Sequence, residues 1–129
     1  MPGLGQGRSF TELAWARAQF IEKLDINPYP GTLNLLLEQP EDLRSVAVLR
    51  SQAGIEIVPE SPQFCSAKCF PVLLEGKLAG AIVFPEVAGY PPDKLEIISA
   101  VRVKTQLQIE DGDTVTVSLA RDFATVPSQ

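Results

Sequence analysis

Histidine is absent from the 129 residues of this chain, and cysteine occurs only twice. The lack of histidine excludes Ser-His-Asp and Cys-His catalysis, histidine-containing zinc sites and imidazole proton shuttles. Cys65 and Cys69 form one Cys-x3-Cys pair, and no second pair completes a zinc site. We interpret both as small hydrophobic side chains in or beside a strand.

Long apolar runs and clusters of basic residues are also missing. No apolar stretch reaches the length needed to cross a bilayer, and the N-terminus lacks the pattern of a signal peptide, so we expect a cytoplasmic protein without a membrane partner. With 16 acidic and 11 basic residues the net charge is −5, which disfavours nucleic acid as a partner. A small phosphorylated ligand remains compatible, because backbone N–H groups and a divalent cation can hold phosphates.

The length and hydrophobic content fit one globular domain, which we assign to residues 1–129. Apolar spacing predicts one main helix over Phe10–Lys23, introduced by a capping-box pattern from Ser9 to Glu12. A short second helix is expected at Val101–Leu107 and a helical turn at Pro40–Arg44. Strands are expected at Thr32–Leu37, Val46–Leu49, Ile55–Val58, Phe70–Leu74, Leu78–Phe84, Leu95–Ala100 and Thr114–Leu119. Many short strands separated by turn residues predict a mainly β fold, a small barrel.

A glycine-rich segment opens the chain. Gly3, Gly5 and Gly7 alternate with other residues up to Arg8, and the expected helix follows directly. Glycine lets the backbone approach a ligand, and the N–H groups and dipole of a helix N-terminus favour an anion. The segment is neither a Walker loop nor the full dinucleotide fingerprint. Two interpretations stay open: an anion-binding loop, and a flexible N-terminal lead-in.

A second candidate lies in Pro30-Gly31-Thr32-Leu33-Asn34. Thr32 and Asn34 are two residues apart on an expected strand, so their side chains point to the same face. A hydroxyl and an amide carbonyl are hard oxygen donors, and Mg²⁺ commonly takes a few protein oxygens together with water and phosphate. The alternative is that Thr32 caps the turn and Asn34 bonds to a neighbouring loop.

In this order along the chain, the two motifs resemble the archaeal-type CTP-dependent riboflavin kinases. The resemblance rests on Gly3-Leu4-Gly5-Gln6-Gly7-Arg8, Pro28-Tyr29-Pro30-Gly31-Thr32-Leu33-Asn34, Gly80–Pro85, Leu95–Ile98 and Ile109–Asp113. It extends from Gly3 to about Leu119, and Gly-Thr-Leu-Asn is its most specific part. It implies a six-stranded cradle-loop barrel, related to RIFT barrels, with one main α-helix and a short second one. It also implies transfer of the γ-phosphoryl group of CTP to the 5′-hydroxyl of riboflavin, giving FMN and CDP.

The resemblance further implies roles for individual residues. The residues implied to hold the CTP nucleotide are Gly3, Leu4, Gly5, Gln6, Gly7, Arg8, Val101, Arg102, Val103 and Lys104. Thr32 and Asn34 are implied to hold Mg²⁺. Ala88 and Glu96 are implied to contact the flavin, with Glu96 as the catalytic residue that orients or deprotonates the ribityl hydroxyl. Phosphoryl transfer relies on positioning and charge neutralisation, so it needs no histidine.

The sequence departs from the family pattern in three places. The family has a strand before the glycine loop, whereas this chain begins almost at Gly3; Gln6 stands where an acid is usual; and the loop Ala88–Pro91 lacks the family's threonine and histidine. Two alternatives to a kinase therefore stay open: a non-catalytic nucleotide- or flavin-binding barrel, and a transcription-factor-like barrel, against which the acidic charge counts.

For single residues, an ordinary structural role without catalysis or binding also stays open. Glu96 could be a surface carboxylate on an alternating strand, and Arg102 and Lys104 could form a solvated helix face. A monomer is consistent with the sequence.

Overall fold

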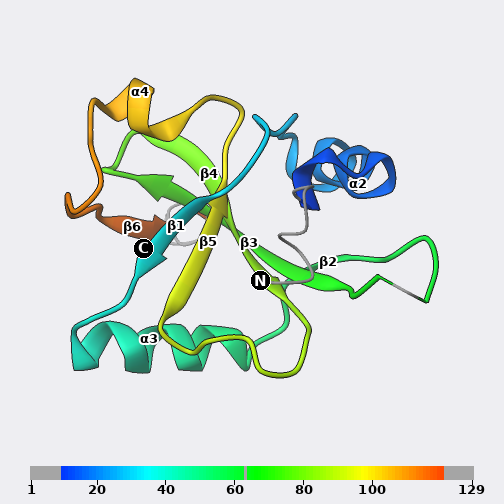
Figure 1. Cartoon of the computed structure of the whole chain (residues 1–129), viewed down its shortest axis with the longest axis horizontal. Helices are drawn as coiled ribbons and strands as arrows, with labels where there is room; N and C mark the ends of the chain where they lie inside the picture. The colour runs from blue at the N-terminus through cyan, green and yellow to red at the C-terminus, as the bar shows by residue number, and fades with distance from the viewer. Residues whose placement is uncertain (1–9, 63, 121–129) are drawn as a thin grey trace, which may run out of the picture.

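The computed structural model describes residues 10–62 and 64–120. Within them, six strands form one antiparallel sheet in the order β1-β5-β4-β3-β2, and β6 pairs with the second half of β3. The strands are β1 (Leu33–Leu36), β2 (Ile55–Ile57), β3 (Ala67–Leu74), β4 (Leu78–Pro85), β5 (Lys94–Ile98) and β6 (Val117–Leu119). The sheet curls into a half-barrel (Figure 1). The predicted fold class is thereby confirmed, with more helix than expected.

The hairpin of β3 and β4 is the centre of the sheet and matches the predicted one. Its eight paired positions run from Ala67↔Pro85 to Leu74↔Leu78. On the other side of β3, β2 pairs as far as Cys69 and β6 begins at Val72. Pro71 lies in the gap between these two partners, where a residue without a backbone N–H is tolerated.

Three α-helices lie against this sheet in the described part of the chain: α2 (Ala14–Leu24), α3 (Pro40–Arg50) and α4 (Val103–Leu107), with a 3₁₀ turn η1 (Phe10–Glu12) before α2. The predicted helix over Phe10–Lys23 therefore starts later, because Leu13 adopts an extended conformation and caps α2 without a side-chain hydrogen bond. The predicted start of the α-helix at Phe10 is wrong, and Ser9, the predicted capping residue, lies outside the described residues.

Helix α3 replaces two elements expected from the sequence, the turn at Pro40–Arg44 and the strand at Val46–Leu49. Pro40 and two acidic residues occupy its first turn, and Arg50 lies in its last turn. This distribution matches the helix dipole and the preference of proline for a helix start. Val46 is buried, with a leucine three residues to either side, which is helical spacing. The strand prediction failed because a short apolar run does not distinguish a strand from a helix face.

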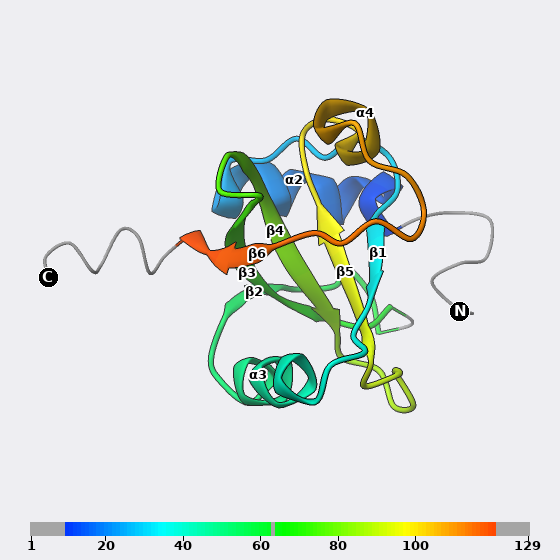
Figure 2. The same cartoon turned by 90° about the vertical axis from the view of Figure 1, so that its left-hand side faces the viewer.

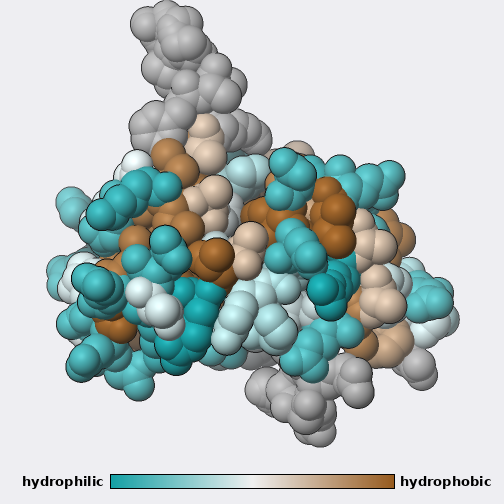
Figure 3. All heavy atoms as spheres, turned by 90° about the horizontal axis from the view of Figure 1, so that it is seen from above, coloured by the Kyte–Doolittle hydropathy of each residue, from teal (hydrophilic) through white to brown (hydrophobic). Residues whose placement is uncertain are grey.

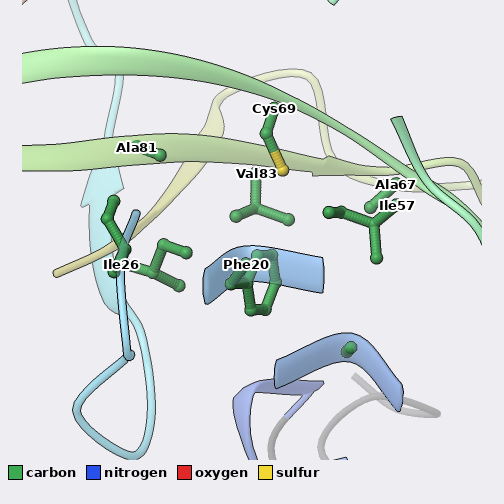
Figure 4. Packing of buried hydrophobic residues seen from close by; sticks show 9 residues of the cluster. Phe20, Ile26, Ile57, Ala67, Cys69, Ala81 and Val83 are labelled. Atoms are coloured by element: carbon green, nitrogen blue, oxygen red, sulfur yellow. The ribbon is translucent and has the colours of Figure 1, made fainter. Parts of the chain in front are cut away.

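Two hydrophobic clusters cover the two faces of the curled sheet, with α2 above and α3 below (Figure 2). In the first, Phe20 of α2 points at Val83 and Cys69, between Ile26 and Ile57 (Figure 4). The second cluster contains Phe70, Val72, Leu74, Ile82, Phe84, Leu95 and Ile97 from the sheet with Val46 of α3 and Val103 of α4. Both cysteines are free thiols, and Cys69 is fully buried as predicted.

The outer edge of β2 is covered by α2 rather than by another strand. The side-chain amide of Gln19 donates to the Val58 carbonyl and accepts from the Val58 N–H, each at 2.7 Å. Lys23 donates to the carbonyl of Glu56 in β2 at 2.7 Å. These bonds satisfy backbone groups that an exposed edge would leave open.

No helix in the part of the chain that the structure describes is both long and apolar enough to span a bilayer. On the face seen from above, hydrophobic and hydrophilic side chains of the described residues are interspersed (Figure 3).

Candidate active site

The pairing of β1 with β5 brings the predicted metal residues and the predicted catalytic residue together. Asn34 lies directly opposite Glu96 in the antiparallel register. Opposite residues share a face of the sheet, and Thr32 is two residues before Asn34. Leu33 and Leu35 point the other way and pack on the second core cluster. The alternation of polar and apolar residues in this strand thus separates the core from the site.

Three side-chain oxygens converge at this point. The Thr32 hydroxyl lies 3.2 Å from Asn34 Oδ1 and 3.2 Å from Glu96 Oε1. A hydroxyl has one hydrogen, so it donates to one of these acceptors at a time and keeps lone pairs for another partner. The arrangement is a small cluster of hard oxygen atoms from residues 64 positions apart in sequence.

Glu96 is buried, with 8% of its surface exposed, so it is not the surface carboxylate that the sequence left open. The Tyr90 hydroxyl donates to its Oε2 at 2.6 Å, and Lys94 Nζ lies 3.8 Å from the same oxygen. Burial, followed by the hydrogen bond to Glu96, raises the pKa of Tyr90 well above its ordinary value. Tyr90 therefore stays a neutral donor at physiological pH and fixes the orientation of the carboxylate.

One pocket opens beside Thr32, and we call it the turn pocket. Its volume is about 170 Å³. It is lined by Tyr29, Pro30, Gly31, Thr32, Leu33, Ile97, Ser99, Val101, Arg102, Val103 and Lys104. The Pro-Gly-Thr turn and the predicted nucleotide segment Val101–Lys104 thus meet in one place, although the side chain of Val103 is buried in the core.

Local backbone contacts shape the turn pocket. The Tyr29 N–H donates to the Ser99 carbonyl at 2.8 Å, which joins the turn to the end of β5. Gly31 has a φ of 95°, in the region that favours glycine. Its N–H donates to the hydroxyl of buried Thr11 at 2.8 Å. The start of the described chain is thereby attached to the Gly-Thr-Leu-Asn element.

A second pocket of about 420 Å³ lies beyond Tyr90, and we call it the loop pocket. It is lined by Arg50, Lys68, Phe84, Pro85, Glu86, Val87, Ala88, Gly89, Tyr90 and Pro92. Ala88, predicted to contact the flavin, is in this lining. Arg50, Lys68 and Tyr90 were missed from the sequence. Tyr90 lies in the loop Ala88–Pro91, which departs from the family pattern. No local sequence feature distinguishes Arg50 or Lys68 from ordinary surface cations.

The predicted nucleotide residues Gly3–Arg8 lie outside the described residues. Thr11, three positions after Arg8, is bonded to Gly31 beside Thr32. The other predicted nucleotide residues line the turn pocket. Arg102 donates to the Thr105 hydroxyl at 2.8 Å, and Lys104 forms an ion pair with Asp111, which holds the pKa of that carboxyl below its usual value.

The oxygen cluster fits the chemistry of Mg²⁺. The described residues contain no group of three or more His, Cys, Asp or Glu side chains that could hold a metal. A hydroxyl, an amide oxygen and one carboxylate oxygen are the hard donors present, and Mg²⁺ completes its coordination with water and phosphate oxygens. Thr32 and Asn34 could therefore hold this ion only in company with a phosphorylated ligand or water.

Comparisons with known proteins point to one family. A family model named CTP-dep_RFKase, described as "Domain of unknown function DUF120", matches residues 1–119. A riboflavin kinase of Methanosarcina barkeri is 36% identical over 123 residues, covering 94% of this chain and 54% of the relative. A riboflavin kinase of Archaeoglobus fulgidus is 39% identical over 120 residues, 91% of this chain and 51% of the relative.

The chain spans about half the length of the first of these relatives. A riboflavin kinase of Methanothermobacter thermautotrophicus is matched over nearly its whole length. It is 33% identical over 117 residues, which cover 91% of this chain and 92% of the relative. The match of the family model over nearly the whole chain and these identities decide the assignment: the chain belongs to the CTP-dependent riboflavin kinase family.

Proposed function

We propose that this chain transfers the γ-phosphoryl group of CTP to the 5′-hydroxyl of riboflavin, giving FMN and CDP, with Mg²⁺ bound. The observation that carries the proposal is the position of Glu96 between the two pockets. Its Oε1 faces Thr32 of the turn pocket, and its Oε2 faces Tyr90 of the loop pocket. A carboxylate between a donor pocket and an acceptor pocket can orient the acceptor hydroxyl and accept its proton during phosphoryl transfer.

In this proposal the turn pocket binds the nucleotide. Arg102 and Lys104 supply positive charge, and the Pro-Gly-Thr turn supplies backbone that a ligand can approach. Gly3–Arg8 complete the nucleotide site, as the sequence predicts. The hydrogen bond between Gly31 and Thr11 supports this, because it holds Thr11, three positions after Arg8, beside the turn pocket. Gly3–Arg8 and the segment Val101–Lys104 determine specificity for the cytosine base.

Thr32 and Asn34 hold Mg²⁺ through their side-chain oxygens. The bound ion neutralises charge on the phosphates. The hydroxyl of Thr32 is well suited to this role because its lone pairs remain available while it donates its hydrogen to Glu96. Leu33, between them, anchors the strand in the core.

Riboflavin occupies the loop pocket, with the ribityl chain directed to Glu96. The 5′-oxygen forms the new bond to the γ-phosphorus, the bond from that phosphorus to the bridging oxygen breaks, and CDP leaves with the electron pair. Glu96 accepts the hydroxyl proton. Tyr90 holds the carboxylate in place by donating to the oxygen that faces away from Thr32.

We propose that residues 1–129 form one riboflavin kinase-like domain. The riboflavin kinase of Methanothermobacter thermautotrophicus, of which the chain covers 92%, supports this extent.

The test is to incubate the chain with riboflavin, Mg²⁺ and each nucleoside triphosphate in turn and to separate the flavins by chromatography. FMN should form with CTP, and CDP should form in equal amount. Omission of Mg²⁺ should abolish the reaction. Tight binding of CTP and riboflavin without FMN would support the non-catalytic alternative. FMN formation at equal rates with all four nucleotides would reject the CTP assignment but keep the kinase.

A further inference from the structure

The loop pocket contains Arg50, a cation with one buried donor atom that has no acceptor among the described residues. Arg50 is the last residue of α3, and its guanidinium stacks on the Phe84 ring at 4.7 Å from the ring centroid. No carboxylate of the described residues forms an ion pair with it. Its Nη2 atom is buried and has no hydrogen-bond partner in residues 10–62 and 64–120. A shielded donor without an acceptor is unfavourable.

The other charged groups of the loop pocket are already engaged. Lys68 donates its ammonium hydrogen to the backbone carbonyl of Arg50. Glu86 accepts from the Ser66 hydroxyl at 2.8 Å. Arg50 and Tyr90 line the same pocket, and the positive charge of Arg50 opposes the rise in the pKa of Tyr90 that burial causes. The donors of Arg50 are thus the ones left for a ligand.

The pocket favours a neutral planar ligand with strong acceptor oxygens over a multiply charged anion. Its two cations, Arg50 and Lys68, are matched by two carboxylates, Glu86 in the lining and Glu96 next to it, so the pocket has no net charge that would select a multiply charged anion. Apolar and aromatic side chains of its lining, such as Tyr90 and Val87, suit the faces of a ring system. A volume of about 420 Å³ is within the range of small-molecule sites, about 300–1,000 Å³.

We propose that Arg50 is a specificity-determining residue that donates to a ring carbonyl oxygen at the pyrimidinedione end of the flavin. This inference rests on the proposed function, which puts riboflavin in the loop pocket with its ribityl chain at Glu96. The guanidinium turns from its position on Phe84 toward the carbonyl, and Nη2 thereby gains the partner that it lacks. The planar fork of donors matches a ring edge better than an ammonium does.

The test measures binding, which is independent of turnover, through the quenching of riboflavin fluorescence. Arg50→Met should weaken riboflavin binding about 10–100-fold, the range for a lost hydrogen bond from a charged group. Arg50→Lys, which keeps the charge and loses the fork, should give an intermediate loss. Arg44→Met, an exposed cation of α3 outside the pocket lining, should bind like the wild type. CTP affinity should not change in any of the three variants.

Two riboflavin analogues, each with sulfur in place of one ring carbonyl oxygen, sharpen the result, because sulfur is a weaker acceptor. The wild type should discriminate against one analogue, and Arg50→Met should lose that discrimination. If Arg50→Met binds riboflavin as the wild type does, or keeps the discrimination, the role of Arg50 is wrong and the proposed function is unaffected. If the wild type binds no riboflavin, the proposed function is wrong and the role of Arg50 is wrong with it.

Discussion

The turn pocket and the loop pocket are built in different ways. Residues 29–33 and 101–104 supply most of the turn pocket, so it is formed by two short stretches whose backbone is bent at Gly31 and at the start of α4. The loop pocket collects single side chains from α3, β3, β4 and the following loop. A site shaped by local backbone leaves a contiguous motif in the sequence. A site made of dispersed side chains leaves none.

This difference explains where the family resemblance was strong. The Gly-Thr-Leu-Asn element belongs to the turn pocket, and the departures at Ala88–Pro91 belong to the loop pocket. In the second pocket, Tyr90 bonds to Glu96 from within the loop that differs from the family pattern. The loop pocket therefore contains a contact to Glu96 from a segment that departs from the family pattern, and substitutions there are the most informative.

The largest expected effect comes from Glu96, which joins the two pockets. Glu96→Gln keeps the shape and can still accept from Tyr90, but it cannot take a proton. We expect kcat to fall about 10²–10⁴-fold, with little change in KM for riboflavin, if the carboxylate acts as a base. Initial rates of FMN formation measure this.

Glu56→Gln is the matched control, since Glu56 is an exposed carboxylate of β2 outside both pockets. It should retain wild-type rates. A Glu96→Gln enzyme with unchanged kcat but weak riboflavin binding would instead make Glu96 a binding residue. In that case the two pockets would not be joined by a base.

The second largest effect belongs to the turn-pocket side. Asn34→Ala removes one of the converging oxygens, and we expect Mg²⁺-dependent CTP binding to weaken on the order of 10–100-fold, as for other groups that support a bound metal. Calorimetric titration of CTP at several Mg²⁺ concentrations measures the shift. Asn27→Ala, which removes an exposed amide bonded to Arg17, is the control. Equal Mg²⁺ dependence in wild type and Asn34→Ala would contradict the metal assignment.

Much of the fold followed from the sequence because it depends on alternation and turns. The hairpin of β3 and β4, the strand β5 and the helix α4 all occur close to their predicted bounds. Helix α3 was not expected, although Pro40 and the acidic residues after it are typical of a helix start, because the apolar run from Val46 to Leu49 also fits a strand. Helical spacing over the whole segment would have corrected this.

For the site, two-residue spacing correctly predicts that the side chains of Thr32 and Asn34 lie on one face. Spacing alone does not give burial, which depends on Tyr90 covering Glu96. Register between β1 and β5 decides that Asn34 meets Glu96, and register is a property of the whole sheet. The loop-pocket position of Arg50 requires the packing of α3 under β4, which no local motif encodes.

The third prediction concerns Tyr90→Phe, which leaves the loop pocket filled but removes the bond to Glu96. We expect a fall in kcat of about tenfold, because hydrogen bonds to charged groups are worth about 1.5–3 kcal/mol and part of the orientation is kept by Thr32. The KM for CTP should not change. A loss confined to riboflavin KM would show that Tyr90 contacts the flavin and does not position the carboxylate.

Tyr90 also predicts a pH effect on stability. Its pKa is raised in the folded protein, so between about pH 10, where the unfolded tyrosine ionises, and the higher folded value, only the unfolded state loses the proton. Stability is therefore fully present below about pH 10 and falls as pH rises. Melting temperatures from pH 8 to 11 should decrease more steeply in the wild type than in Tyr90→Phe. Tyr29→Phe, at an exposed tyrosine, should keep the wild-type slope.

The smallest effect is expected at the rim of the turn pocket, where two substitutions should change CTP affinity in opposite directions. Lys104 lines this pocket and is bound to Asp111, and that carboxylate is fully exposed. If Lys104 contributes to nucleotide binding, Asp111 competes with the phosphates for it. Lys104→Met should then weaken CTP binding about two- to fivefold, and Asp111→Asn should strengthen it by a similar factor, because exposed ion pairs are weak. Both effects should shrink at high salt.

The control is Lys77→Met, in the exposed turn between β3 and β4, which should leave CTP affinity unchanged. Variants at Lys104 and Asp111 that shift the affinity in the same direction would show that their ion pair only supports α4, and that the charge on the nucleotide is met elsewhere in the turn pocket.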